Sequence, residues 1–355
     1  MIAMITDTHF GVSNFDKTIF HYQLDFFKEQ FFPFLLEHNV KDVLHLGDLC
    51  HHRQVMDIYI QQNLDREFFG FFEKNDIKLW LLVGNHDTYY KADNDISYVY
   101  TLEKYKSVVI IDKPFQHIFE NKNFGFIPWG YESELNKGIL HPDNISVLCG
   151  HFEMGDILEN PVRSTLKVSD FADYEEVLSG HYHSKIKNST VQYCGSPYPM
   201  DRNDYGMQKG FWYYDITGKH FVENTISPKF LKVEYNDDGK NLSILVDDGI
   251  TKTEFSNAVL ATEFIGENFT DIYVKKYINE VMLDKFLGDI KNTKRYQNYE
   301  VVAALEEESQ QTEHEKGIKD SCIEYINALT FEIEINQDFL IELFTELYDE
   351  AEEML

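Results

Sequence analysis

Residues 79–87 read Leu-Trp-Leu-Leu-Val-Gly-Asn-His-Asp, an apolar run that stops at Gly84 and gives way to three polar residues. This pattern is typical of a buried strand that delivers polar side chains at its carboxyl end. Glycine at the junction favours a sharp turn, because it adopts backbone angles closed to other residues. On its own, the stretch fits two readings equally well: a strand end that carries functional side chains, or a plain strand followed by a Gly-Asn surface turn. The rest of the chain must decide between them.

The composition is that of a globular protein with a large core. The chain has 355 residues, of which 43% are hydrophobic, which favours two or three domains. No apolar run is long enough to span a bilayer, and residues 1–6 already resemble a strand rather than a secretion leader. The four cysteines lie far apart, at Cys50, Cys149, Cys194 and Cys322. This scatter predicts free thiols in a reducing cytoplasm and argues against a cysteine zinc site.

The charge is strongly negative and unevenly distributed. The formal net charge is −29, and residues 301–355 hold 16 acidic residues against 2 basic ones. Such a protein repels nucleic acid at long range. If nucleic acid is the substrate, metals, local basic residues or a partner must provide the contact.

Short apolar runs and helical patterns alternate through the first 216 residues. Strands are expected at 1–6, 43–46, 78–83, 108–111, 124–128, 146–149, 176–179, 191–194 and 211–216. Helices are expected at 16–38, 57–74 and 97–105, with Pro33 kinking or ending the first. This alternation predicts an α/β layer architecture, and the later strands without helices predict a second sheet packed on the first.

The composition changes near residue 219. Strand-like segments at 230–235 and 271–277, separated by Asp/Asn/Gly turns, predict a small α+β domain over 219–290. Residues 291–319 are polar and charged, which favours a linker. An apolar stripe returns in 320–355, at Phe339, Leu340, Leu343, Phe344, Leu347, Tyr348 and Ala351. This spacing predicts an amphipathic helix, with Asn336 as a candidate N-cap.

Metal-ligating residue types follow five of the expected strands. They are Asp7 and His9, Asp48, Asn85 with His86, His151, and His181 with His183. Polar groups at successive strand ends meet in one crevice in open α/β sheets. In Asp7-x-His9 and His181-x-His183, the alternation of an extended chain would point both side chains the same way. Any one of these histidines alone would be read as an ordinary core or surface residue.

Apart from His86, the set holds two carboxylates, one amide oxygen and four histidines. That exceeds a single tetrahedral zinc site and suits two cations that share a bridging carboxylate. Nitrogen and oxygen ligands without sulfur suit manganese, iron or zinc, and magnesium is a further possibility.

The same motifs support a family resemblance over residues 1–215. They are Asp7-x-His9, Gly47-Asp48, Gly84-Asn85-His86-Asp87, Gly150-His151 and Gly180-His181-x-His183. Together they resemble the calcineurin-like metallophosphoesterase superfamily, and Gly47-Asp48-Leu49-Cys50-His51 is similar to its SbcD nuclease family. Further stretches are similar to the recombination endonuclease subunits of T-even phages: 84–91, 111–114, 180–183, 195–197 and 210–212.

The resemblance implies a role for each site residue. One metal would be held by Asp7, His9, Asp48 and His183. The other would be held by Asp48, Asn85, His151 and His181, so that Asp48 bridges the two. The metals would activate a water and clamp the phosphodiester for in-line attack. His86 would lie beside them and stabilise developing charge or protonate the leaving oxygen. His51 belongs to the implied catalytic set, and Asp87 either orients His86 or is a turn residue.

The resemblance also implies fold, activity and partners. The fold would be a two-sheet α/β metallophosphoesterase sandwich over 1–218, flanked by helices. A capping or DNA-binding domain would cover 219–290, and the helical segment 320–355 would bind an SMC-like ATPase. The activity would be that of a manganese-dependent DNA exonuclease and endonuclease in recombination and repair. The chain would form a homodimer through helices near 57–74 and 97–105. It would be located in the cytoplasm, which for a phage protein is the cytoplasm of the host.

One departure separates branches of the superfamily. Protein phosphatases carry an Asp-Arg pair three and four residues after the bridging aspartate, where this chain has His51 and His52. His51 matches the nuclease branch, and His52 is expected to be a solvated loop residue. Candidate phosphate contacts are Arg53, Arg163 and Arg202, each equally a plain surface charge.

Two other functions compete with the nuclease. A stand-alone phosphatase or phosphodiesterase for small phosphoesters is favoured by the acidic charge. A metal-free interaction scaffold on the same fold ranks last, because every motif residue is present.

Overall fold

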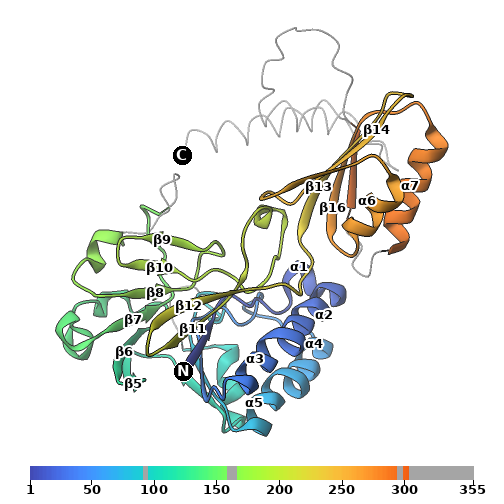
Figure 1. Cartoon of the computed structure of the whole chain (residues 1–355). Coiled ribbons are helices and arrows are strands. Elements are labelled where there is room, and N and C mark those ends of the chain that lie inside the picture. The colour runs from blue at the N-terminus through green and yellow to red at the C-terminus, as the bar shows by residue number, and fades with distance from the viewer. Residues whose placement is uncertain (91–94, 158–165, 294–298, 304–355) are drawn as a thin grey trace, which may run out of the picture. The chain divides into compact units, whose positions relative to one another are not determined.

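The computed structural model describes residues 1–90, 95–157, 166–293 and 299–303 (Figure 1). The chain divides into two units, 1–304 and 305–355, and the second lies outside the described residues. Three β-sheets organise the first unit. The finding confirms the expected mixed α/β class. Among the described residues, no helix is long and apolar enough to cross a membrane.

The first sheet has the order β12-β11-β1-β2-β3-β4. Its strands are β1 (Ile2–Ile5), β2 (Asp42–His45), β3 (Lys78–Leu82), β4 (Val108–Ile111), β11 (Gly210–Asp215) and β12 (Gly218–Glu223). The first four run parallel, while β11 pairs antiparallel with β1 and with β12. Parallel strands buried on both faces read as continuous apolar runs, which is why β1 to β4 are evident in the sequence.

The second sheet has the order β5-β6-β7-β8-β10-β9. Its strands are β5 (Phe115–Phe119), β6 (Lys122–Ile127), β7 (Val147–Gly150), β8 (Val177–Ser179), β9 (Ile186–Asn188) and β10 (Val191–Tyr193). One core cluster combines residues of both sheets, such as Met4, Leu44 and Leu82 with Phe124 and Leu178. The two sheets therefore form a sandwich with an apolar interior.

A phenylalanine-rich core lies on the other face of the first sheet. Alternation sends Ala3 and Ile5 of β1 into this second cluster, while Ile2 and Met4 face the sandwich interior. The helices on this side are α2 (Lys17–Phe26), α3 (Phe32–Glu37), α4 (Ile58–Asn63) and α5 (Gly70–Asn75). Figure 1 shows these four helices grouped together, away from β5–β10. Most phenylalanines of these helices belong to this core.

The expected helix at 16–38 continues through Pro33 to Glu37, so the alternative that Pro33 ends it is wrong. A π-helical stretch, Phe27–Phe31, joins α2 to α3, and the Phe32 N–H donates to the Phe27 carbonyl. Pro33 directly follows this wider turn and has no N–H to donate, so the continuous helix lacks one backbone hydrogen bond at this residue. A similar π-helical stretch, Leu64–Phe69, joins α4 to α5. The third expected helix is a 3-10 helix, Tyr98–Lys104.

Three strands in this part of the chain were not expected: β5, β9 and β12. β5 and β9 are edge strands whose residues are largely half-buried or exposed, so they lack the apolar run of a central strand. β5 joins β6 through a two-residue turn, Glu120-Asn121, in which both residues have positive φ. Such turns fit hairpin twist, but the usual Asn-Gly signal is missing here.

Residues 230–303 build the third sheet, in the order β15-β14-β13-β16-β17. Its strands are β13 (Phe230–Asp237), β14 (Leu242–Asp247), β15 (Lys252–Phe255), β16 (Phe269–Lys276) and β17 (Tyr299–Ala303). Helices α6 (Ala258–Ile265) and α7 (Glu280–Thr293) contribute to the core of this sheet. β17 occupies part of the stretch expected to be a linker. The remainder of the expected 291–319 linker after 303, and all of 320–355, lie outside the described residues.

Candidate metal centre

The seven expected ligands follow strands of both sheets, and the structure brings them together. Asp7 and His9 follow β1, Asp48 follows β2, Asn85 follows β3, His151 follows β7, and His181 and His183 follow β8. Asp7, His9, Asp48 and His151 are almost fully buried, each at most 2% exposed. The crevice at the ends of the parallel strands is therefore lined by polar groups removed from water.

The backbone at these positions differs from the expected extended chain. The φ angles are positive at Asp7 (52°), His9 (42°), Asp48 (58°) and His181 (89°). Such angles cost roughly 1–3 kcal/mol each for residues other than glycine and cluster at functional sites. The side chains of each pair converge because the chain turns sharply after the strand.

One group of donors gathers around His9. The Nε2 atoms of His9 and His183 lie 3.0 Å apart, and Asp7 Oδ1 lies 3.9 and 4.0 Å from them. Asp7 is fixed by the His181 backbone N–H and the Thr6 hydroxyl, both of which donate to its carboxylate. This group matches three members of the first expected ligand set.

A second group gathers around Asn85. Asn85 Oδ1 lies 3.0 Å from His151 Nε2 and 2.9 Å from His181 Nδ1. The other ring nitrogen of His151, Nδ1, faces the Leu46 carbonyl at 2.8 Å. Because a carbonyl only accepts, His151 Nδ1 carries a proton and directs Nε2 toward the centre. This group matches three members of the second expected set.

Asp48 lies between the two groups. Its Oδ2 atom is 3.5 Å from His9 Nε2 and 3.3 Å from His151 Nε2, while its Oδ1 accepts from the His86 backbone N–H. Burial alone would raise the pKa of the Asp48 carboxyl, but His151 and His9 hold that pKa well below its usual range. An ionised carboxylate in this place fits a bridging ligand.

The donor set fits two divalent cations. His9 Nε2 and His183 Nε2 face each other, and Asn85 Oδ1 faces two imidazole nitrogens. Two of the residue groups close enough to hold one ion are Asp7–His9–His183 and Asp7–Asp48–His151. At the His9–His183 contact and at the Asn85 contact, lone pairs of nitrogen and oxygen atoms converge. A cation can bind several of these lone pairs at once, whereas a proton satisfies only one contact.

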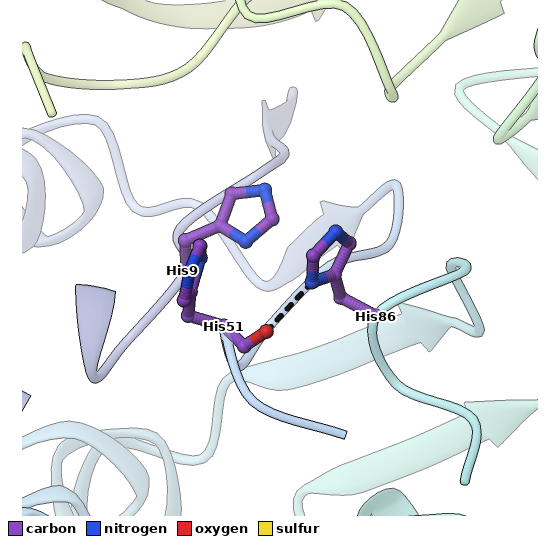
Figure 2. Close-up of side chains that lie close together, drawn as sticks. All are labelled: His9, His51 and His86. Carbon is purple, nitrogen blue, oxygen red and sulfur yellow. Dashed lines mark hydrogen bonds between the residues drawn. The ribbon is translucent and has the colours of Figure 1, made fainter. Parts of the chain in front are cut away.

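Two further histidines lie beside the centre. Figure 2 shows the rings of His51 and His86 beside that of His9, with ring centroids 5.3 and 4.8 Å from it. His86 Nδ1 lies 2.6 Å from the His51 carbonyl, so Nδ1 carries a proton. Burial, with the neighbouring imidazoles of His86 and His52, lowers the pKa of His51 to about 4. His51 is therefore neutral at physiological pH.

Asp87 does not orient His86, and this expected alternative is corrected. The Asp87 carboxylate accepts hydrogen bonds from the backbone N–H groups of Gly84, Asp48 and Leu49, at 2.8–2.9 Å. Burial raises the pKa of Asp87 to about 7, and the Asp48 carboxylate adds to this rise. Asp87 is a turn residue that holds the backbone of Asp48 in its left-handed conformation.

The other basic candidates vary. His52 is not a solvated loop residue as expected, because it is half-buried and its ring packs at a tilt against Phe15, with centroids 4.3 Å apart. Arg202 forms an ion pair with Asp271 at 3.1 Å. Arg53 is half-buried, and Arg163 lies outside the described residues.

Sequence reasoning did not identify two neighbours of the centre. Thr6 donates to Asp7, and Trp129 stacks on His181 with ring centroids 5.7 Å apart. Thr6 could have been found from its place beside Asp7 at the end of β1. Trp129 follows β6, and its sequence context carries no sign of the contact.

An α/β sandwich with clustered His, Asp and Asn side chains at its strand ends is the architecture of a metal-dependent phosphoesterase. The chain belongs to the calcineurin-like phosphoesterase family, whose model matches residues 1–185. It is therefore a metal-dependent phosphodiesterase by class.

Comparison with curated proteins and solved structures gives more distant relatives. The chain is 26% identical over 364 residues to Exonuclease subunit 1 of Enterobacteria phage T4, covering 99% of each. Similar solved structures include the protein of unknown function AQ665 from Aquifex aeolicus. That match is 18% identical, with a TM-score of 0.24, and covers 47% of this chain and 87% of that one. GAP50 of Plasmodium is 12% identical with a TM-score of 0.33, covering 85% of this chain and 96% of that one.

Proposed function

We propose that this protein is a two-metal DNA nuclease that hydrolyses phosphodiesters at DNA ends, both as an exonuclease and as an endonuclease. The observation that carries the proposal is Asp48, whose Oδ2 lies between the His9 group and the His151 group. The similarity over nearly the full length to an exonuclease subunit supports DNA as the substrate.

The chain's own residues define the chemistry around the metals. Bound divalent cations in such sites supply Lewis-acid activation of water and phosphate. Asp7, His9, Asp48 and His183 would hold one ion, and Asp48, Asn85, His151 and His181 the other. We take both as manganese, which the resemblance to the nuclease family implies and which nitrogen and oxygen ligands without sulfur allow.

His86 would protonate the leaving oxygen or stabilise the negative charge that develops on it. The His51 carbonyl retains the proton on His86 Nδ1, so Nε2 is the atom free to exchange a proton with substrate. His51, neutral and next to His86, would donate one hydrogen bond to a phosphate oxygen without adding positive charge.

The test compares linear duplex DNA with a nitrophenyl phosphodiester under manganese. The nuclease predicts turnover of the duplex that Asp48→Asn abolishes, with much weaker turnover of the small ester. Efficient hydrolysis of the small ester alone would contradict it. That outcome would support the second candidate, a phosphodiesterase for small phosphoesters, which the net charge of −29 favours.

The partner proposal concerns residues 320–355, which lie outside the described residues. The similar phage protein is named a subunit, which supports a complex. We propose that 320–355 binds an SMC-like ATPase, that the complex acts in recombination and repair, and that the chain forms a homodimer. We place it in the cytoplasm, because Cys50, Cys149 and Cys194 are buried free thiols.

Deleting residues 320–355 tests the partner. Cleavage with manganese should persist, while co-purification with the ATPase and stimulation by ATP are lost. Undiminished ATPase binding by the shortened chain would refute the assignment, and a sharply lower melting temperature would indicate that this segment stabilises its own chain instead.

A further inference from the structure

His183 is the expected ligand that packing holds least. Its side chain is 36% exposed, against 16% for His181 and 2% or less for His9 and His151. It lies on the irregular segment between β8 and β9, which forms no strand ladder at this point. Something other than burial must fix its ring 3.0 Å from that of His9.

The fixed point is the main-chain carbonyl of His183. Three donors meet there: Lys209 Nζ at 2.8 Å, the Ser196 backbone N–H at 3.1 Å and, more weakly, the Ser196 hydroxyl at 3.4 Å. Lys209 also donates to the Ser196 hydroxyl at 2.9 Å. Gly195 makes this approach feasible, because a Cβ there would lie 3.1 Å from the same carbonyl and the residue has φ of +77°.

Lys209 is an unusual residue to find in this position. It is only 4% exposed, although lysine is almost never fully buried unless it is paired. Its partner is Asp204, itself 6% exposed, whose carboxylate also accepts from the Met200 backbone N–H. Burial lowers the pKa of Lys209, and Asp204 opposes that effect. A buried, paired ammonium costs desolvation that an apolar side chain avoids, so its retention needs a reason.

We propose that Lys209, held by Asp204, is a positioning residue that clamps the His183 carbonyl and thereby sets the His183 imidazole for the metal that it shares with His9. This inference rests on the proposed function, because it assumes that His183 is a metal ligand. Lys209 contacts no substrate and acts only through His183. Outer-sphere contacts of this kind typically change metal affinity 10–100-fold.

The test uses paired variants, because removing Lys209 alone would leave Asp204 buried and unpaired. Lys209→Met/Asp204→Asn removes both charges, while the amide oxygen of the new Asn side chain still accepts from Met200. The matched control is Lys219→Met/Glu176→Gln, which removes another ion pair, 2.6 Å long and 12% and 22% exposed, that does not contact His183. Manganese binding is measured by titration and by electron paramagnetic resonance.

The parent and the control should bind two Mn²⁺ and show a spin-coupled signal. The Lys209→Met/Asp204→Asn variant should retain one Mn²⁺ at parental affinity, bind the other about 10–100-fold more weakly, and show an uncoupled signal at limiting metal. A purely structural role would lower the melting temperature without this selective loss.

Other outcomes overturn one statement or the other. If the parent binds two Mn²⁺ and the Lys209 double variant binds both equally well, the positioning role is refuted while the proposed function stands. If that variant does not fold, Lys209 serves the fold and the positioning role is likewise refuted. If the parent binds no Mn²⁺, the proposed metal centre itself fails.

Discussion

Asp48 is the residue on which both halves of the centre depend. It is buried, ionised, and within 3.5 Å of imidazole nitrogens that belong to different groups. Removing its charge affects two proposed cations at once, whereas removing a residue outside the groups affects neither.

We therefore expect Asp48→Asn to abolish cleavage and to weaken both metals. His86→Ala should retain both metals and lose catalysis by ~10²-fold or more, because His86 belongs to neither of the two proposed ligand sets, although it is close enough to His9 and His51 to form a third possible group. Metal analysis of the two purified variants decides the matter. If His86→Ala lost a metal while Asp48→Asn kept both, the assignment of Asp48 as the bridging ligand and of His86 as a residue outside the ligand sets would be wrong.

His151 gives the metal-free protein a pH-dependent stability. Burial lowers the pKa of His151, but Asp48, Asp7 and the Leu46 carbonyl together outweigh burial and raise that pKa to about 9, above the ordinary value of 6.5. The protonated form is thus favoured by folding. Protonation of His151 in the folded state adds about 3 kcal/mol to the free energy of unfolding. This contribution is fully present below pH 6.5 and is lost as the pH rises through 9.

Denaturant unfolding in the presence of a chelator should therefore show stability falling between pH 6.5 and 9. In His151→Gln this fall should be much smaller. An equally steep fall in the variant would mean that another group is responsible.

Residue types explain which parts of the centre were predictable. Asp7, Asp48 and His151 stand out because a polar side chain directly after an apolar strand has few other reasons to be there. The Leu46 carbonyl and Lys209 gave no such signal: every residue has a carbonyl, and a single lysine reads as surface charge. Their roles depend on which distant backbone atoms the fold brings to them.

At the level of elements, the turn after β3 depends on the absence of a side chain at Gly84. Gly84 is not among the glycines with positive φ, so its expected role in an unusual backbone angle is wrong. Instead, a Cβ there would collide with the backbone nitrogen and carboxylate of Asp48. The ends of β2 and β3 can approach each other only because this atom is missing.

Gly84→Ala should consequently displace Asp48, weaken metal binding and destabilise the fold by about 1–3 kcal/mol. The matched control is Gly288→Ala within α7, where a Cβ meets no atom within 4 Å. That change should stabilise by roughly 0.5–1 kcal/mol, because alanine favours helices. Chemical denaturation and manganese titration measure both effects. Equal stability of the two variants would refute the close-approach argument.

The elements themselves differ in how clearly the sequence announces them. The central strands β1, β2 and β3 are mainly buried and were evident, whereas the edge strands β5 and β9 were not. Pro33 misled because the sequence contains no sign of the π-helical stretch Phe27–Phe31 that precedes it. Local patterns report burial well and report hydrogen-bond register poorly.

At the level of the whole molecule, the net charge of −29 conflicts with a polyanionic substrate. Arg202, one of the few candidate phosphate contacts, is already paired with Asp271. The proposed nuclease would therefore contact DNA through the metals, through other local basic residues or through a partner protein.

The isolated chain should bind duplex DNA weakly and with a shallow dependence on salt, because few phosphates are neutralised. Binding isotherms at several salt concentrations, with calcium in place of manganese to prevent cleavage, measure the slope. Tight binding that falls steeply with salt would reveal a basic surface in the full chain and contradict this expectation.

Trp129, which stacks on His181, gives the molecule an intrinsic optical probe. The two other tryptophans, Trp80 and Trp212, donate from their indole nitrogens to Asp42 and to the Cys194 carbonyl instead. Paramagnetic Mn²⁺ bound at His181 should quench Trp129 emission, so occupancy of that one position can be followed by fluorescence without a label. Trp129→Phe should remove the response and Trp80→Phe should preserve it, which would let stopped-flow mixing time the arrival of the ion at His181.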